Sequence, residues 1–236
     1  AARDAENLTP DEKEHLREGF VHGVELVDGT ARLAAMNMLL HGMTRADGPS
    51  PIDVKDALTA DPGDRWSVVL ANPPFGTKSA VKMIGEDGKT TTENLEIVRD
   101  DFWVTTANKQ LNFVQHIKTI LDINGRAGVV LPDNVLFEGG AGETLRTRLL
   151  KEFDVHTLVR LPTGIWYSGG VKANVLFFDK RPASDTPWTD KLWVYDFRTN
   201  QHFTLKQNPI RRSHLDEFVD CYKPGRPRSE RVESER

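Results

Sequence analysis

Short apolar runs alternate along the chain with segments whose apolar residues recur at helical spacing. The apolar runs predict strands, and they lie at 20–26, 66–71, 127–132, 155–162 and 173–180. The helically spaced segments predict helices within 29–43, 108–126 and 143–153. Strands that alternate with helices are typical of α/β proteins, so we expect a doubly wound sheet.

The predicted strand 66–71 runs directly into Asn72, Pro73, Pro74 and Phe75. Its apolar character is continuous rather than alternating, which predicts a strand that is covered on both faces. In open α/β sheets, ligands bind outside the carboxyl ends of the strands. The four turn residues are therefore candidate site residues.

These four residues suit a planar heterocycle that carries an exocyclic amine. The two prolines have no amide N–H, so backbone carbonyls in the turn stay available as acceptors. The Asn72 carboxamide adds a further acceptor, and the Phe75 ring offers a flat face for stacking. An amine held by Asn72 and the Pro73 carbonyl would be drawn toward a tetrahedral, nucleophilic geometry without a strong base. The alternative is an ordinary turn after a strand.

The remaining segments predict surface structure and an appendage. Residues 76–101 are polar and predict a long surface loop, 191–197 and 201–206 predict a hairpin, and 213–222 predicts a short helix. The charged Pro/Gly segment 223–236 predicts a flexible tail. We therefore expect three parts, which are a catalytic domain over 1–181, the hairpin and helix over 182–222, and the tail over 223–236.

Composition limits the partners and the setting. The net charge of −4 and the pI near 6.0 give no global basic character, so a nucleic-acid partner would need positive charge from another component. Cys221 is the single cysteine, which excludes an internal disulfide and a multi-cysteine zinc site and favours a reduced, cytoplasmic setting. The histidines show no metal-ligand spacing, and no apolar run approaches the roughly 18 residues of a membrane helix.

The motif NPPF after an apolar strand resembles the catalytic motif of DNA methyltransferases that modify the exocyclic amine of adenine. The segments GVELVDGTARLAAMNMLLHG, GRAGVVLPDNVLF, LLKEFDVHTLVRLPTGIWYSGGVKANVLFF and FVDCY extend the resemblance over about residues 20–223. Together they are similar to the modification (M) subunit of type I restriction–modification systems. The resemblance implies a doubly wound mixed sheet of the Rossmann-like, S-adenosylmethionine-dependent methyltransferase type.

The resemblance also implies a set of ligands and roles. S-adenosylmethionine is the methyl donor, Glu25 binds its ribose hydroxyls, and Asp56 lies near its adenine. Residues 72–75 act on a flipped adenine, the amine attacks directly, and Cys221 is no nucleophile. The implied partners are double-stranded DNA, a specificity subunit, a second modification subunit and a restriction subunit, with no membrane and no metal.

Four more residues are candidates for DNA contact. Lys78 and Lys82 flank the turn in the predicted loop and could meet phosphates, although solvated lysines are an equal alternative. Trp166 and Tyr167 resemble the family's segment near the target-base pocket, with core packing as the alternative.

One expected element is absent from these residues. The family's Gly-rich loop of the PACGSGG kind has no counterpart here, and we expect it to precede Ala1. The first strand, which belongs between the strands ending at Glu25 and Ala71, would then be missing. We therefore expect weak donor binding or none, and no activity from the fragment alone. Two alternatives stay open: a methyltransferase acting on a protein glutamine amide, whose motif usually reads Asn-Pro-Pro-Tyr, and a non-catalytic assembly module.

Overall fold

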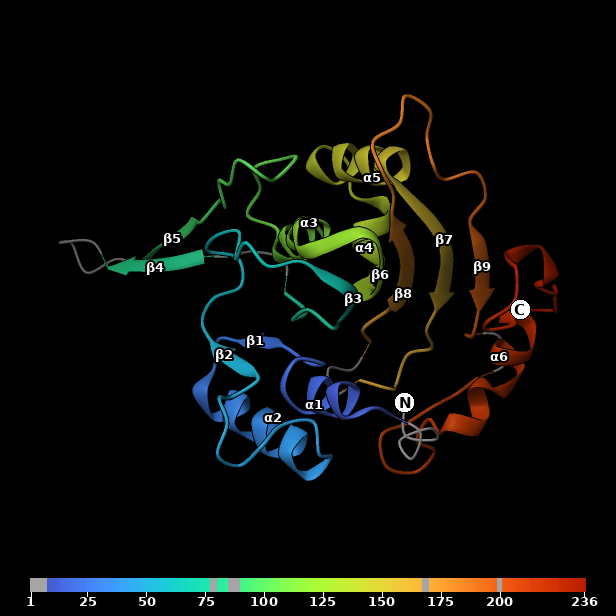
Figure 1. Ribbon diagram of the computed structural model, residues 1–236. Coiled ribbons are helices and arrows are strands. Elements are labelled where there is room, and N and C mark those ends of the chain that lie inside the picture. The colour runs from blue at the N-terminus through green and yellow to red at the C-terminus, as the bar shows by residue number, and fades with distance from the viewer. Residues whose placement is uncertain (1–7, 77–79, 85–89, 167–169, 199–200) are drawn as a thin grey trace. The chain divides into compact units, whose positions relative to one another are not determined.

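The central feature of the computed structural model is a five-stranded mixed sheet (Figure 1). The structure describes residues 8–76, 80–84, 90–166, 170–198 and 201–236. In spatial order the strands are β3 (Trp66–Ala71), β6 (Leu121–Pro132), β8 (Ala173–Lys180), β7 (Phe153–Arg160) and β9 (Trp193–Asp196). Only β8 runs antiparallel to its neighbours, and β3, β6, β7 and β9 are parallel. This arrangement confirms the predicted α/β class with a mixed sheet.

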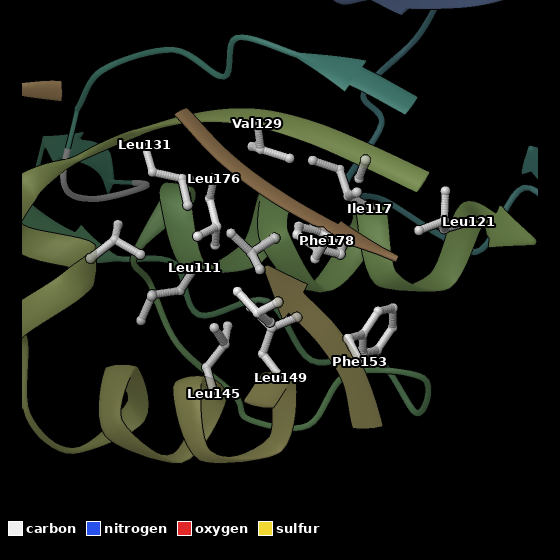
Figure 2. Packing of buried hydrophobic residues seen from close by; sticks show 14 of the residues in the cluster. Leu111, Ile117, Leu121, Val129, Leu131, Leu145, Leu149, Phe153, Leu176 and Phe178 are labelled. Atoms are coloured by element: carbon white, nitrogen blue, oxygen red, sulfur yellow. The ribbon is translucent and has the colours of Figure 1, made fainter. Parts of the chain in front are cut away.

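Three helices cover one face of this sheet: α3 (Lys109–Ile120), α4 (Asp133–Phe137) and α5 (Ala141–Glu152). Figure 2 shows Leu111 of α3 and Leu145 of α5 in one cluster with Leu176 and Phe178 of β8. These side chains are at most 6% exposed. Burying an aliphatic or aromatic side chain contributes about 1.5–3 kcal/mol, so this cluster holds the helices that flank the site against the sheet.

The opposite face is covered only over part of its width in residues 61–236. A second cluster packs β7 and β9 against η2 (Arg212–Leu215) and α6 (Asp216–Tyr222), with Tyr195 and Phe197 fully buried. It does not reach β3, whose Val68 and Leu70 are 54% and 80% exposed. The predicted burial of this strand on both faces is therefore wrong within the described residues, because the second cluster ends before the edge strand.

Two predictions about the end of the chain are wrong. Segment 191–197 forms β9 and pairs in parallel with β7, while residues 201–206 form no strand, so the predicted hairpin is absent. Burial of Tyr195 and Phe197 against the second cluster favours the sheet edge over an exposed hairpin.

The segment 223–236 packs on the protein and includes η3 (Arg228–Glu230). Arg228 binds Asp154 at 2.6 Å and Asp179 at 2.7 Å, two carboxylates that are largely buried. A buried carboxylate needs a partner, which is why this segment is not the flexible tail that its composition predicts.

The segment 76–101 is also more regular than predicted. β4 (Ala80–Ile84) and β5 (Thr90–Asn94) pair antiparallel within it, so the structure replaces the expected irregular loop by a two-stranded ribbon.

Residues up to Ala60 form a separate compact unit. It contains α1 (Pro10–Glu18), β1 (Gly23–Glu25), α2 (Asp28–Leu40) and β2 (Ile52–Val54). β1 and β2 pair in parallel, with α2 as the crossover between them. The predicted division of the chain at 181 and 222 stays a prediction.

Candidate active site at the carboxyl edge of the sheet

The turn that follows β3, residues 72–76 and hereafter the proline turn, lies at the carboxyl end of that strand. Asn72 is exposed and Pro73 is buried. Within the part of the chain that the structure describes, neither the Asn72 carboxamide nor the Pro73 carbonyl makes a hydrogen bond. Both predicted acceptors are therefore available to a ligand.

The Pro74 carbonyl differs, because a side chain of α3 binds it. Gln110 is 2% exposed, and its Nε2 donates to the Pro74 carbonyl at 3.2 Å and to the Gly76 carbonyl at 2.6 Å. Asn108 caps the same helix by accepting from the Gln110 amide at 3.0 Å. Sequence reasoning missed Gln110; the available signal was a glutamine directly before the first buried leucine of an amphipathic helix.

The Phe75 ring is supported by Trp166, which lies in the loop after β7. The two ring centroids are 5.2 Å apart at an interplanar angle of 75°, an edge-to-face contact. Trp166 also packs against the second cluster, and its Nε1 is buried without a partner in the described structure. Trp166 therefore supports the Phe75 ring, and its predicted contact with DNA stays a prediction.

Of the other three candidates for DNA contact, the structure describes only one. Lys82 lies in β4, opposite Thr92 of β5, and its role stays a prediction. Lys78 and Tyr167 lie outside the described residues.

The carboxyl ends of β6 and β7 contribute a second polar group that sequence reasoning missed. Asp133 accepts from Asn174 Nδ2 at 2.7 Å, and its other oxygen lies 3.5 Å from Arg160 Nη2. Asn174 is fully buried, yet among the described residues neither its Oδ1 nor the buried Nε of Arg160 has a hydrogen-bond partner.

Buried polar atoms without partners are concentrated at this edge. Among the described residues five side-chain atoms are in that state, and all except Tyr195 Oη belong to this region: Gln110 Oε1, Arg160 Nε, Trp166 Nε1 and Asn174 Oδ1. An unsatisfied buried group costs about 1–3 kcal/mol, so native proteins keep few of them. Gln110 and Trp166 contact the proline turn, and Arg160 and Asn174 lie at the end of β7 and the start of β8, on the same edge of the sheet. This edge therefore suits a polar ligand.

Glu25 and Asp56 lie in the unit of residues 8–60 and meet at one edge of its sheet. Glu25 ends β1 and pairs with Val54, and Asp56 follows two residues beyond Val54. One oxygen of Glu25 accepts from the Val27 amide at 2.8 Å, and one of Asp56 accepts from the Leu58 amide at 2.9 Å. Each carboxylate keeps a second oxygen without a hydrogen bond in the described structure, which fits an acceptor for ligand hydroxyl or amine groups.

A hollow of about 400 Å³ lies elsewhere, between the exposed side chains of β3 and the C-terminal segment. Its lining includes Leu70, Phe177, Tyr222 and Arg226, and none of the predicted site residues. Among the described residues no group of three His, Cys, Asp or Glu side chains could hold a metal ion, and no described helix is long and apolar enough to cross a membrane.

Comparison with known proteins identifies the family of this chain. A family model described as N-6 DNA Methylase matches residues 4–233. The chain belongs to the N-6 DNA methylase family. The asparagine and the two prolines that follow β3 are thus part of an N-6 DNA methylase domain.

Relatives of this N-6 DNA methylase chain are subunits of type I restriction enzymes. The EcoKI methylase subunit of Escherichia coli K12 is 41% identical over 227 residues, which cover 93% of this chain and 40% of the relative. The StySPI methylase subunit of Salmonella potsdam gives the same values. These matches confirm the predicted resemblance to modification subunits, and the chain spans about 40% of the length of these relatives.

Solved structures agree with the sequence comparison. The crystal structure of the EcoKI M protein has a TM-score of 0.79 at 40% identity and covers 94% of this chain and 44% of that protein. A Listeria monocytogenes protein described as an S-adenosylmethionine-dependent methyltransferase has a TM-score of 0.51 at 14% identity, which shows a shared fold alone.

Proposed function

We propose that this chain carries the catalytic turn of a DNA adenine N6-methyltransferase, as part of the modification subunit of a type I restriction–modification system. One observation carries the proposal: Asn72 Oδ1 and the Pro73 carbonyl are both unbonded in the described structure, at the carboxyl edge of the sheet and beside the Phe75 ring. Family membership supports the same chemistry.

The two acceptor oxygens of the proline turn match the two N–H donors of an adenine amine. The amine has two N–H groups, and the turn offers two oxygens, one from the Asn72 carboxamide and one from the Pro73 backbone. Accepting both hydrogens keeps the amine in place and leaves its nitrogen lone pair free to react. No strong base is needed, because the proton leaves after the nitrogen has become positively charged.

Phe75 offsets part of the cost of reaching the base. An adenine in a duplex must be flipped out of the stack before its amine can enter the turn, which costs a few kcal/mol. Stacking of the base on an aromatic side chain returns about 1–3 kcal/mol. Edge contact with Trp166 holds the Phe75 ring for this purpose.

The residues of the first unit fit the donor. S-adenosylmethionine, when bound, supplies the electrophilic methyl group of its sulfonium. We infer that the second carboxylate oxygen of Glu25 accepts from its ribose hydroxyls and that Asp56 lies near its adenine amine. This is the role of an acid at the carboxyl end of a strand in nucleotide-binding sheets.

The partners follow from the type I assembly. We propose that a specificity subunit selects the DNA site, and that a second modification subunit and a restriction subunit complete the complex on double-stranded DNA in the cytoplasm. The net charge of −4 supports this division, because the chain alone does not provide the positive charge that DNA binding requires. A solved structure of a type I restriction–modification complex has a TM-score of 0.74 to this chain at 28% identity.

Substitution of Asn72 in the full-length protein, assembled with its specificity subunit, tests the proposal. Sequencing of host DNA for N6-methyladenine first identifies the modified site, and transfer of tritiated methyl groups to a duplex with that site is then measured. Asn72→Ala should lower the methylation rate by about 100-fold or more, since it removes a group that acts on the reacting amine.

The matched control is Asn37→Ala, an exposed asparagine on α2 that lies outside the turn. It should leave the rate unchanged, and both variants should bind S-adenosylmethionine as the wild type does. Methylation by Asn72→Ala at the wild-type rate would overturn the proposed function.

A further inference from the structure

We propose that Gln110 is a positioning residue that holds the proline turn in its reactive conformation. The inference rests on the proposed function, because it assigns Gln110 a role in the same methyl transfer. Gln110 does not touch the reacting amine; it acts through the backbone on either side of Phe75.

The proline turn lacks the N–H donors that would hold it in place by backbone hydrogen bonds of its own. Pro73 and Pro74 have no N–H, so neither residue can donate a backbone hydrogen bond within the turn. Gly76, at its other end, is the residue type with the greatest backbone freedom. The ring of Phe75 thus stands between a rigid pair and a flexible residue, and its direction depends on an outside support.

Gln110 provides that support with both hydrogens of one amide group. Nε2 donates to the carbonyls of the two residues that flank Phe75, Pro74 and Gly76. The amide orientation is fixed by this pattern, since a flipped Gln110 would place its oxygen against two carbonyl oxygens. The same pattern leaves the Pro73 carbonyl and the Asn72 carboxamide to the substrate.

The helix that carries Gln110 is anchored at the same end. Asn108 accepts from the amides of Gln110 and Leu111 and donates to Glu138 at 2.7 Å, while Leu111 is fully buried in the first cluster. The buried amide also has a cost, because Gln110 Oε1 has no partner in the described structure. A leucine would fill such a position without that cost, so the donated pair of hydrogen bonds is the feature that requires glutamine.

Gln115 offers a matched control on the same helix. It is fully buried, and its Nε2 donates to the Val104 carbonyl at 3.0 Å and to Asn112 at 3.3 Å. It also accepts from the Val104 amide at 2.9 Å. Gln115→Met therefore removes buried amide hydrogen bonds of the same kind without touching the proline turn.

The test compares Gln110→Met with Gln115→Met in the full-length protein assembled with its specificity subunit. Methionine keeps the length of the side chain but has no N–H to donate. We expect Gln110→Met to lower the single-turnover methylation rate by about ten- to a hundredfold, with the Kd values for S-adenosylmethionine and DNA within about twofold of wild type. Gln115→Met should lower the Tm at least as much and leave the rate within about twofold.

A spectroscopic readout separates positioning from general stability. A duplex with 2-aminopurine at the mapped target adenine reports the flipped base, and stacking on Phe75 quenches its fluorescence. Gln110→Met should flip the base but quench it less than the wild type, whereas Gln115→Met should match the wild type. If Gln110→Met does not fold, Gln110→Asn replaces it; its amide is one methylene too short to bridge both carbonyls, so an intermediate rate supports the inference.

The outcomes separate the two proposals. Wild-type rate and quenching in Gln110→Met or Gln110→Asn, together with an inactive Asn72→Ala, would overturn the role of Gln110 alone. An active Asn72→Ala would overturn the proposed function as well.

Discussion

The contact between Trp166 and Phe75 leads to a quantitative prediction about catalysis. We expect Trp166→Leu to slow methylation because it removes the ring edge that supports Phe75. Trp166→Phe keeps a smaller aromatic edge, so it should give a smaller loss. Neither substitution removes a side-chain hydrogen bond, because Trp166 Nε1 has no partner in the described structure.

The magnitude follows from the geometry of the pair. A centroid distance of 5.2 Å and an angle of 75° lie in the favourable edge-to-face range, for which coupling is about 0.5–1.5 kcal/mol. If this energy orients Phe75 for the flipped base, its loss lowers the single-turnover rate by about 2- to 13-fold, at 1.36 kcal/mol per tenfold change.

A double-mutant cycle with Phe75→Ala isolates the effect. Rates of the wild type, Trp166→Leu, Phe75→Ala and the double variant are measured on the mapped duplex at saturating donor. Trp166→Leu should cost less in the Phe75→Ala background, by a coupling of about 0.5–1.5 kcal/mol.

Trp103 supplies the control for this cycle. Trp103 makes a similar edge contact with Phe153, at 6.0 Å and 82°, within the first cluster. Trp103→Leu should lower the Tm without slowing the methylation of folded protein. Strictly additive rate losses for Trp166 and Phe75 would refute the reasoning.

Two further predictions concern the donor and the C-terminal segment. Glu25→Gln replaces the carboxylate proposed to bind the ribose by a weaker acceptor, so titration calorimetry of the full-length protein should show about tenfold weaker S-adenosylmethionine binding, whereas unchanged affinity would remove Glu25 from the donor site. Arg228→Met should lower the free energy of unfolding by about 1–2 kcal/mol at pH 7, because it leaves Asp154 and Asp179 without their closest cation. Burial alone would raise the pKa of Asp179, yet this pKa lies below its ordinary value because His156, Arg228 and Arg181 favour the carboxylate. A depressed pKa contributes stability that is present above about pH 4 and lost as the pH falls through the folded-state pKa, so urea titrations should show the difference between wild type and Arg228→Met shrinking in acid; a constant difference would contradict the assignment.

Much of the fold followed from local patterns. The strands 66–71 and 173–180 appear where the apolar pattern predicts them, because burial constrains which positions are apolar. The helix predicted within 108–126 is confirmed over 109–120, whereas residues 121–126 belong to β6. The predictions failed where composition resembled a surface segment. Residues 223–236 are charged and rich in Pro and Gly, yet their arginines bind carboxylates that are distant in sequence.

The amino-acid sequence by itself determined the proline turn, since two prolines after a strand restrict the backbone and remove two N–H donors. It also determined the acids at the ends of β1 and β2, because a strand end followed by a carboxylate is a local feature. Only the tertiary structure brought Gln110 under the turn and Trp166 against Phe75, across 34 residues in the first case. Such contacts depend on how α3 and the loop after β7 pack on the sheet, and no local pattern encodes that packing.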